Sequence, residues 1–576
     1  MTTRMRRPPR MAGLHGTART VRRAAKRLPP GAAMRETDEI VSRDVIVVGG
    51  GHNALTAAAY LARAGLDVCV LERRDVLGGA CVTEELWPGY RVSRASYVVS
   101  MLQPKVVADL RLREHGYEPI PLDPPYATVP AGTPVFFHDD PAAAQASIAR
   151  VSAHDARAYP EFMALLERAA AFVRPLLLKA PPAIGSRAPG DLPSLVAWAA
   201  RGAGLSRARL HELYRLMTLS AGDLLDEWFE HDALKGCLAS TGVVGVWAGP
   251  YTPGTAYNLL HHALGSLDGA GGAWGHVRGG MGAISLALAR AAEAHGAVVR
   301  TGAEVASIDV AGGAVTGVTL AGGETLRAPL VVSGAHPQTT ILDLAGAEHF
   351  PDEVADAMRR YRTRGASVKV NLVLARPPAY AGVTAHEQRM LLHTGVALCG
   401  SVADLERAWH EAVLGRPATA PYVEVEVPSA VDPTLADGDG CVVTMFTQYG
   451  PHDEAGWPDG ARERYLRACL GVLESVAPGV ADSVVHAEVL APPDLERIFG
   501  LRGGSIFHGE QDLAQLAFMR PAPDLARYAT PVDGLYLCGA GTHPGGGVMG
   551  ASGHNAAMRV LADRRRVRVK RRVLRR

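Results

Sequence analysis

The sequence predicts an α/β protein that contains a Rossmann-like dinucleotide-binding domain. Two observations carry this prediction. Residues 44–64 read as an apolar strand, a glycine-rich turn and a helix of small residues, and residues 534–562 repeat that order near the C-terminus. The chain has 576 residues, of which 48% are hydrophobic and 20% are charged. This composition is typical of globular proteins rather than disordered or membrane-embedded ones, and the length suits two or three domains.

The N-terminal segment predicts a complete βαβ unit. Residues 44–48 (Asp-Val-Ile-Val-Val) suit a parallel strand buried on both faces, residues 54–64 suit a helix, and residues 67–71 suit the next strand. Between them, Gly49 permits a tight turn, Gly51 lets the backbone approach a pyrophosphate, and the small Ala54 lets the helix pack closely on the strand. The helix N-terminus offers free N–H groups to the phosphates.

Two features after this unit narrow the nucleotide. Glu72 follows Gly51 by 21 residues at the end of the next strand, where its carboxylate can accept hydrogen bonds from ribose hydroxyls. An acid at that position disfavours a 2′-phosphate. Gly78 and Gly79 form a second glycine pair that lets the chain pass beside the pyrophosphate and ribityl chain of a larger cofactor. The residues therefore favour FAD over NAD.

The C-terminal glycine-rich turn predicts the other end of the cofactor site. Residues 539–550 are almost stripped of large side chains, which suits the close approach of a flat ring. The start of the following helix, near Val548 and Met549, is expected to face the N1–C2=O edge of the flavin, where charge gathers on reduction. His543 either exchanges a proton with the flavin or substrate, or fixes the turn. His508, in a separate glycine-rich turn, either contacts the flavin or substrate, or stabilises its own loop.

The middle of the chain predicts a second, α+β region. Residues 140–235 read as mostly helical, and residues 236–260, which lack charge but contain several Gly and Pro residues, read as buried loop and turn. The patterns favour helices at 282–295 and 459–476 and a final helix at about 551–562. Strands are expected at 297–309, 314–320, 325–333, 367–375, 422–427 and 441–448. The last three of these segments alternate like half-buried strands.

Both ends of the chain are basic. Residues 1–35 contain ten Arg or Lys and no acid, and residues 559–576 contain ten with one Asp. Either these ends are solvated tails, or they contact anionic lipid headgroups. Met34 is a possible alternative start, and residues 1–33 are alternatively a targeting segment. We expect a cytoplasmic protein, membrane-peripheral if the tails bind lipid, or a mitochondrial matrix protein if the source is eukaryotic. No nucleic-acid partner is expected.

The cysteines and histidines predict no metal site. The seven cysteines are scattered and none forms Cys-x-x-Cys, so neither a disulfide framework nor a dithiol redox pair is supported. No second strand–GxGxxG–helix is present for a separate nicotinamide domain. The electron acceptor is therefore expected to be oxygen, a quinone, or NAD(P) bound without a fold of its own.

With these residues assembled, the chain resembles the phytoene desaturase and carotenoid oxidoreductase branch of the FAD-dependent amine-oxidase-like superfamily. The resemblance covers about residues 42–562 and is carried by 47–54, 279–282, 302–305 and 539–545. A narrower match within this branch rests on 252–257, 260–262, 503–510 and 518–521.

The resemblance implies an amine-oxidase-like two-domain flavoprotein. Its FAD-binding domain would comprise residues 41–110, 270–345 and 530–563, and a discontinuous α+β substrate domain would comprise 111–269 and 346–529. A basic arm (1–40) and a basic tail (564–576) would flank them. The residues expected to bind FAD are Gly49, Gly51, Ala54, Glu72, Arg73, Gly78, Gly79, Val305, Gly539, Gly541, Gly546, Gly547, Val548 and Met549.

The expected activity is transfer of a hydride between an apolar substrate, of the polyene or lipid class, and flavin N5. The candidate catalytic residues are His543 and His508. One alternative is oxidation of an amine, although residues 538–558 contain no aromatic side chain of the kind that amine oxidases of this superfamily place beside the flavin. Another alternative is a flavin-stabilised binding or regulatory protein without turnover.

Overall fold

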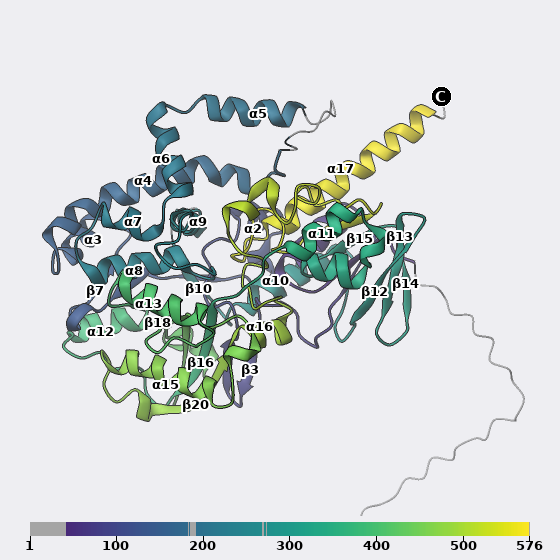
Figure 1. The fold of residues 1–576 in the computed structure, drawn as a ribbon. Coiled ribbons are helices and arrows are strands. Elements are labelled where there is room, and N and C mark those ends of the chain that lie inside the picture. Colours follow the sequence, from purple (N-terminus) through teal and green to yellow (C-terminus); the bar gives the residue numbers. More distant parts are fainter. Residues whose placement is uncertain (1–41, 183, 185–191, 268–269, 272, 575–576) are drawn as a thin grey trace, which may run out of the picture. The chain divides into compact units, whose positions relative to one another are not determined.

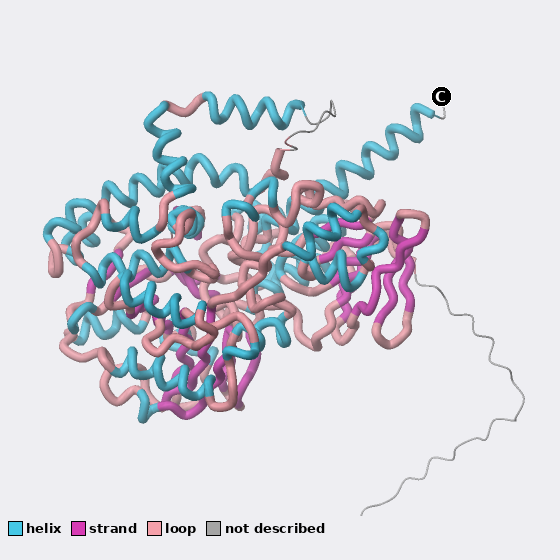
Figure 2. The backbone as a smooth tube through the Cα atoms, in the orientation of Figure 1, coloured by secondary structure: helices cyan, strands magenta, loops and turns pink. Residues whose placement is uncertain are grey.

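The computed structural model describes residues 42–182, 184, 192–267, 270–271 and 273–574. The expected basic arm (1–40) and the alternative start Met34 lie outside these residues. Figure 2 shows that helices and strands both occur throughout the described chain, as the predicted α/β class requires. The proposed division of the chain into two domains at particular residues stays a prediction.

A five-stranded parallel sheet forms the first structural unit, in the order β11-β2-β1-β15-β21. Strand β15 of this sheet is labelled in Figure 1. Every neighbouring pair is parallel, so all five carboxyl ends share one edge. All four residues of the central strand are buried, as the Val-Ile-Val-Val pattern predicts. The strands are β1 (Val45–Val48), β2 (Val68–Leu71), β11 (Val298–Arg300), β15 (Val331–Ser333) and β21 (Leu535–Leu537).

Three helices share one apolar core with this sheet: α1 (His52–Arg63), α10 (Gly282–Glu293) and α17 (Ala551–Leu574). Helix α1 approaches α17 closely because Gly553 has no side chain, and a Cβ there would collide with the Asn53 carbonyl oxygen. The last helix was expected to end near residue 562, but α17 continues through the basic residues to Leu574. Arginine and lysine are good helix formers, which explains the continuation.

A separate antiparallel sheet consists of β12 (Val305–Ala311), β13 (Ala314–Leu320) and β14 (Thr325–Arg327). This arrangement corrects two predicted strands. The segment 297–309 divides into β11 and β12, in different sheets, with Gly302 at φ +61° between them. The segment 325–333 likewise divides into β14 and β15, with Pro329 between them. A left-handed glycine and a proline each interrupt an extended strand.

A seven-stranded sheet forms the second large unit, in the order β20-β16-β19-β18-β17-β6-β7. The strands are β6 (Tyr126–Thr128), β7 (Val135–Phe137), β16 (Ser367–Leu374), β17 (Gly395–Leu398), β18 (Tyr422–Glu426), β19 (Cys441–Gln448) and β20 (Val484–Leu490). The prediction that β16, β18 and β19 are half-buried is wrong, because every residue of these three strands except Cys441 is buried. One face packs against apolar side chains of helices, and the polar face lines an internal cavity.

The described residues of the segment 140–235 are mostly helical, as predicted. The prediction that 236–260 is loop and turn is only partly right: helix α8 (Asp232–Val243) covers its start and helix α9 (Ala256–Ala263) its end, with turns between them at 244–255. The further helices are α2 (Pro104–Asp109), α3 (Pro141–Ile148), α4 (Ala153–Leu177), α5 (Leu192–Ala203), α6 (Arg207–Thr218), α7 (Ala221–Asp226), α8 (Asp232–Val243), α9 (Ala256–Ala263), α11 (Asp352–Arg360), α12 (Ala385–Leu392), α13 (Val402–Val413), α14 (Pro428–Val431), α15 (Ala461–Glu474) and α16 (Pro492–Phe499).

Within the described residues, the remaining strands form three short two-stranded ribbons: β3 (Thr83–Trp87) with β4 (Tyr90–Ser93), β5 (Pro119–Pro121) with β10 (Gly275–Val277), and β8 (Ser266–Leu267) with β9 (Ala270–Gly271). Among the described residues, no helix combines the length and the apolar composition that crossing a bilayer requires.

Candidate active site

The N-terminal glycine turn lies at the carboxyl edge of the parallel sheet. Gly49 directly follows β1 and has a φ of +91°, which favours glycine. Gly78 N donates a 2.9 Å hydrogen bond to the Gly50 carbonyl, and a Cβ on Gly79 would touch Gly51 Cα at 3.5 Å. A Cβ on Gly51, by contrast, would have no neighbour nearer than the Gly78 carbonyl oxygen at 4.0 Å. The structure thus brings the two predicted glycine pairs together and leaves one side of Gly51 open.

The first turn of α1 supplies unpartnered polar atoms to the same place. His52 Nε2 and Asn53 Oδ1 are buried without a hydrogen-bond partner among the described residues. Burial lowers the pKa of His52 from 6.5 to about 4, so its imidazole is neutral at pH 7. Ala54, which is predicted to bind FAD, packs against the residue that follows β15. A Cβ on Gly334 would come within 2.7 Å of the Ala54 side chain. A larger residue at 54 would push α1 away from the sheet.

Glu72 is buried at the end of β2, and its carboxylate fixes the glycine turn. Oε2 accepts a 2.6 Å hydrogen bond from Gly50 N, and Oε1 accepts a 2.9 Å hydrogen bond from Arg74 N. An ionised carboxylate has about four lone-pair positions, so two remain for ribose hydroxyls. The Glu72 carbonyl accepts a hydrogen bond from Ala303 N, so the segment that contains Ala303 lies beside the end of β2. Val305, which is predicted to bind FAD, follows two residues later in that segment and is 9% exposed.

Arg73 differs from the other predicted FAD-binding residues. Its side chain is exposed, and Nη2 donates a 3.3 Å hydrogen bond to the Ile498 carbonyl. The guanidinium therefore joins the edge of the nucleotide region to helix α16 in this structure.

The C-terminal glycine turn lies at the same sheet edge as Gly49. Strand β21 pairs with β15, and Cys538 N donates a 2.8 Å hydrogen bond to the Ser333 carbonyl just before the turn begins. A Cβ on Gly539 would approach the Gly334 carbonyl oxygen at 2.7 Å, and one on Gly541 would collide with Pro337. Both glycines are therefore needed for the close packing of this turn on the β15 edge.

The second half of that turn carries a strained residue. Val548 has a φ of +55°, which is rare for a β-branched side chain, and such strain is found most often at functional sites. Gly546 packs against Phe507 and Gly547 against Met101, where Cβ atoms would come within 2.6 Å and 2.7 Å. The Met549 carbonyl accepts a hydrogen bond from Gln103 N, which ties the turn to the start of α2.

A cavity of about 730 Å³ opens beside these turns. Its lining includes Ala80, Cys81 and His52 near the N-terminal glycine turns, and Gly546, Gly547 and Val548 of the C-terminal turn. The rest of the wall is mainly apolar, with Met101, Phe137, Phe162, Leu259, Trp274 and Phe507 among its members. Met163 of α4 also lines the cavity and is 39% exposed, so the cavity reaches the surface beside that helix.

The cavity has a polar wall that the sequence did not reveal, formed by Lys369, Glu424 and Glu426. Lys369 on β16 and Glu424 on β18 both pair with Phe446 of the intervening strand β19, so they lie on one face of the sheet. These side chains are 3%, 6% and 2% exposed. Their alternation with valines suggested a solvent-facing edge. Only the three-dimensional arrangement shows that the polar face is turned into the cavity.

The polar wall is held by tyrosines and by burial. Glu424 accepts hydrogen bonds from the hydroxyls of Tyr97 (2.8 Å), Tyr422 (2.8 Å) and Tyr126 (3.2 Å). Burial raises the pKa of Glu424 from 4.5 to about 7 and lowers that of Lys369 from 10.5 to about 7. Both groups are therefore able to exchange a proton near neutral pH.

The two candidate catalytic histidines occupy different places. His508 lines the cavity, has a φ of +57°, and stacks on His336 with 5.9 Å between ring centroids. Its Nδ1 has no hydrogen-bond partner among the described residues. His543 is buried, with Nε2 lying 3.3 Å from the Leu176 carbonyl oxygen, and it is absent from the cavity lining. Burial lowers the pKa of both to about 4.

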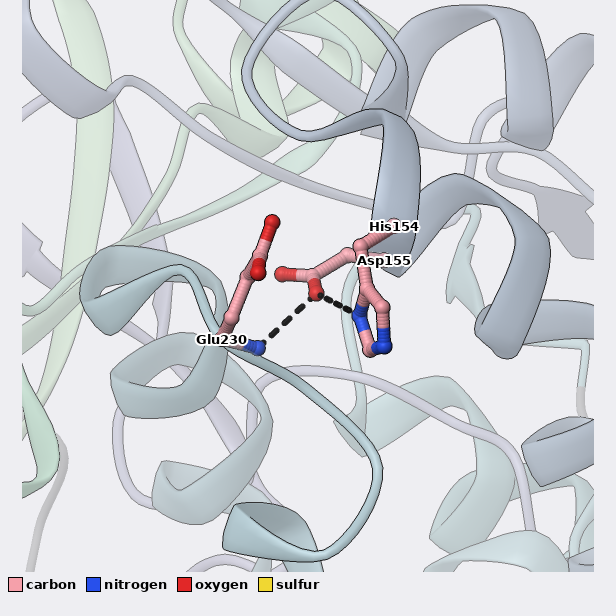
Figure 3. Close-up of side chains that lie close together, drawn as sticks. All are labelled: His154, Asp155 and Glu230. Carbon is pink, nitrogen blue, oxygen red and sulfur yellow. Dashed lines mark hydrogen bonds and ion pairs between the residues drawn. The ribbon is translucent and has the colours of Figure 1, made fainter.

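One group of potential metal ligands occurs among the described residues, away from this cavity: His154, Asp155 and Glu230 (Figure 3). The Asp155 oxygens already accept hydrogen bonds from the backbone N–H groups of Glu230 (2.9 Å) and His231 (3.0 Å). His154 Nδ1 lies 3.1 Å from the same carboxylate. The group ties the start of α4 to the loop before α8, which accounts for it as a structural contact.

The residues at the sheet edge fit FAD. Both turns are rich in glycine, and Glu72 retains acceptor positions for a ribose. Buried polar atoms of His52 and Asn53 have no hydrogen-bond partner in the part of the chain that the structure describes. The cavity begins where the C-terminal turn would border a flat ring.

Comparison with known proteins agrees with this fit. The family model described as flavin containing amine oxidoreductase matches residues 55–561. The chain is 41% identical to pyridine nucleotide-disulfide oxidoreductase domain-containing protein 2 of Rattus norvegicus, over 90% of this chain and 93% of the relative. It is 28% identical to phytoene desaturase (neurosporene-forming) of Cereibacter sphaeroides, over 90% of this chain and 94% of the relative.

Among solved structures, putrescine oxidase bound to putrescine superposes with a TM-score of 0.56 at 17% identity, covering 91% of this chain and 99% of that one. At this identity the likeness shows the fold alone, and it confirms the predicted amine-oxidase-like fold. The resemblance inferred from the glycine motifs is confirmed by the family match, and so is FAD as the cofactor of the family. This chain belongs to the flavin-containing amine oxidoreductase family.

Proposed function

We propose that this flavin oxidoreductase is a dehydrogenase or desaturase that moves a hydride between a carbon atom of an apolar substrate and flavin N5. The observation that carries the proposal is the cavity of about 730 Å³. Its wall is mainly apolar, and it includes the Gly546–Val548 turn that is predicted to border the flavin ring. The similarity to a phytoene desaturase supports a substrate of the polyene or lipid class.

FAD, when bound, supplies the two-electron chemistry. The chain's own residues would bind and orient it. The glycine pairs would accommodate the pyrophosphate, Glu72 would accept hydrogen bonds from the ribose, and the backbone at Val305 would meet the adenine. The residues expected to border the ring are Gly539, Gly541, Gly546, Gly547, Val548 and Met549.

The polar wall would supply the acid–base part of the reaction. A desaturation removes a hydride from one carbon and a proton from its neighbour, so the proton needs an acceptor. Lys369 and Glu424 line the cavity, and burial brings the pKa of each to about 7. Either side chain is then able to take up the proton near neutral pH. His508 would stay neutral and serve as a hydrogen-bonding group, because burial lowers its pKa to about 4.

Amine oxidation remains the second candidate, because two carboxyl groups, Glu424 and Glu426, line the same cavity and would attract an ammonium group. The absence of aromatic side chains from residues 538–558 favours the apolar substrate over the amine. A flavin-stabilised binding protein without turnover is the third candidate.

Anaerobic mixing of the FAD-loaded protein with candidate substrates tests these alternatives. We expect a lipid or a long polyene to bleach the visible absorbance of the flavin, and putrescine to leave it unchanged. Bleaching by amines with peroxide release in air would establish amine oxidation instead. A flavin that stays oxidised with every lipid, polyene, amine and reduced nicotinamide tested would contradict turnover altogether.

The electron acceptor follows from the same preparation. We propose oxygen, a quinone or NAD(P) as acceptor, because the described chain contains one parallel sheet of the nucleotide-binding type. Mixing the reduced protein with each acceptor in turn should give one rate of reoxidation far above the others. Peripheral membrane contact through the basic ends and a cytoplasmic or mitochondrial location stay predictions.

A further inference from the structure

The polar wall of the cavity has hydrogen-bonding capacity that the protein does not use. Glu424 accepts three hydrogen bonds from tyrosine hydroxyls, one at Oε1 and two at Oε2, so one of its roughly four acceptor positions remains. Lys369 Nζ has three donor hydrogens, and its one hydrogen bond within the described chain goes to Asn371 Oδ1 at 2.7 Å.

Glu426 provides independent evidence that a hydrogen-bonding group is missing from the polar wall. Its side chain is 2% exposed and lines the cavity, yet Oε2 has no hydrogen-bond partner among the described residues. His276 Nε2 lies 3.2 Å from that oxygen, within ion-pair distance, but the two groups are not aligned for a hydrogen bond, and His276 Nε2 has no other hydrogen-bond partner within the described part of the chain. Buried polar atoms are normally satisfied, so a carboxylate oxygen left in this state indicates a group supplied from outside the protein.

The arrangement of the strands places these groups together. Glu424 and Glu426 are two residues apart on β18, so both project from the same face of the sheet. Lys369 lies level with Glu424 across the intervening strand β19. Tyr97 connects the two positions, because Lys369 Nζ lies 5.3 Å from its ring centroid while its hydroxyl donates to Glu424.

A pure hydrocarbon would leave this wall unsatisfied. Covering a carboxylate and an amine with apolar surface removes water from them without replacing its hydrogen bonds, which costs free energy for each group. A substrate with an apolar body and a hydrogen-bonding end avoids that cost. The acceptors in the wall select a group that donates a hydrogen bond, an O–H or an N–H.

We propose that Glu424, Glu426 and Lys369 form a subsite for the hydrogen-bond-donating head group of an otherwise apolar substrate. The inference rests on the proposed function, whose substrate class it narrows from hydrocarbons to molecules that carry a hydroxyl or amino group. Glu424 and Glu426 accept from the head group, and Lys369 donates to it where the head group also has a lone pair.

The subsite also sets the direction in which a substrate lies. The segment 97–101 runs along the cavity from Tyr97, at the polar wall, to Met101, which contacts Gly547 of the C-terminal turn. Four residues of chain span at most about 14 Å. A head group held at the wall would therefore direct the substrate's carbon chain along the side of the cavity that runs from Tyr97 to Met101, toward the predicted ring position.

Three probes of equal heavy-atom length test the subsite on the FAD-loaded protein by calorimetric titration: octan-1-ol, octylamine and heptyl methyl ether. The ether matches the alcohol in size but lacks the donor. A hydrogen bond to a buried charged acceptor corresponds to about tenfold or more in affinity, so octan-1-ol or octylamine should bind at least about tenfold more tightly than the ether. Preference for the alcohol would identify an O–H head group, and preference for the amine an N–H head group.

The variants Glu424→Gln and Glu426→Gln should each reduce that preference severalfold while leaving ether binding nearly unchanged. Leu259→Val is the matched control, since Leu259 lines the cavity without a polar atom and its shortening should weaken all three probes alike. Equal affinity of wild-type protein for alcohol, amine and ether would overturn the subsite, and this comparison needs no variant to fold. Flavin that stays oxidised while the probe preference persists would instead contradict the proposed function and leave the subsite intact.

Discussion

Gly51 and Gly78 are both glycines of the nucleotide site, but the structure needs them for different reasons. A Cβ on Gly78 would collide with the Cys81 carbonyl oxygen, and its φ of +125° already excludes most side chains. Gly51 has an extended backbone with an ordinary φ of −73°. The protein atom nearest to an added Cβ there is the Gly78 carbonyl oxygen, at 4.0 Å. The fold therefore requires a glycine at position 78, whereas a glycine at position 51 is needed only for a cofactor that binds beside it.

Gly51→Ala should consequently separate cofactor binding from folding. We expect the variant to fold with a melting temperature close to that of the wild-type apoprotein, because the added methyl group meets no protein atom. Its affinity for FAD should fall by about tenfold or more, because the methyl group occupies the approach to the pyrophosphate. Gly322→Ala, at an exposed turn with open space around it, is the control and should leave both quantities unchanged. FAD retention by Gly51→Ala equal to wild type would refute the placement of the pyrophosphate.

Lys369 gives a prediction for the pH dependence of stability. Burial lowers its pKa from 10.5 to about 7, with Glu488, Glu426 and Glu424 opposing the shift. Between about pH 7 and pH 10.5, Lys369 is protonated in the unfolded chain but not in the folded protein. The free energy of unfolding therefore rises with pH in this range, by up to about 1.4 kcal/mol per pH unit. Below about pH 7 both states are protonated and this contribution is constant.

Denaturant unfolding of wild type and Lys369→Met at several pH values measures this contribution. From about pH 7 to about pH 9, wild type should gain roughly 2 kcal/mol of stability relative to the variant, which cannot titrate at 369. Comparing the two proteins at each pH removes the effect of the other ionisable groups to first order. A constant difference across this range would mean that Lys369 keeps an ordinary pKa in the folded protein.

The burial of Lys369, Glu424 and Glu426 was not predictable from the sequence. Alternation of polar residues with valines predicted the strands correctly but assigned their polar face to solvent. Period-two alternation says only that the two faces differ. Whether the polar face meets water or a cavity depends on segments far away in the chain, here Tyr97 and Tyr126, which cover it.

At the scale of elements, the crossing of α1 and α17 joins the two halves of the cofactor site. Helix α1 follows the N-terminal glycine turn and α17 follows the C-terminal one. Gly553 is buried in this crossing, where a Cβ would collide with the Asn53 carbonyl oxygen. Gly471 in α15 is also a helix-interior glycine, but it is exposed and has open space around it.

Gly553→Ala should therefore destabilise the protein by about 1–3 kcal/mol, because the helices must move apart. Gly471→Ala should stabilise it by about 0.5–1 kcal/mol, since alanine has the higher helix propensity and meets no atom. Thermal unfolding of both variants provides the comparison, and FAD retention should fall for Gly553→Ala alone. Stabilisation by both substitutions would show that the two helices do not pack this closely.

The strands that were predicted wrongly share one cause. Segments 297–309 and 325–333 each contain β-branched residues on both sides of a glycine or proline, and each divides between two sheets. Propensity reports that a residue fits an extended backbone, not which sheet it joins. The breaks at Gly302 and Pro329 mark the change of sheet, and the first βαβ unit was predictable because its pairing is local in sequence.

At the scale of the whole molecule, parallel pairing explains how residues about 490 positions apart form one site. The turns after β1, β2, β15 and β21 meet because all four strands end at one edge. The glycine motifs predicted both ends of this edge from the sequence. The cavity beyond the ring position was not predictable, because its wall combines β16, β18, α4 and α9 with no motif of their own.

The flavin content of the purified protein tests whether both ends of the chain form one FAD site. The protein, reconstituted with FAD and passed through gel filtration, should retain one FAD per chain of 60.8 kDa and give it up only on denaturation. Anaerobic titration with dithionite should then reduce that flavin completely with one two-electron equivalent. A colourless protein that takes up no added FAD would contradict the account.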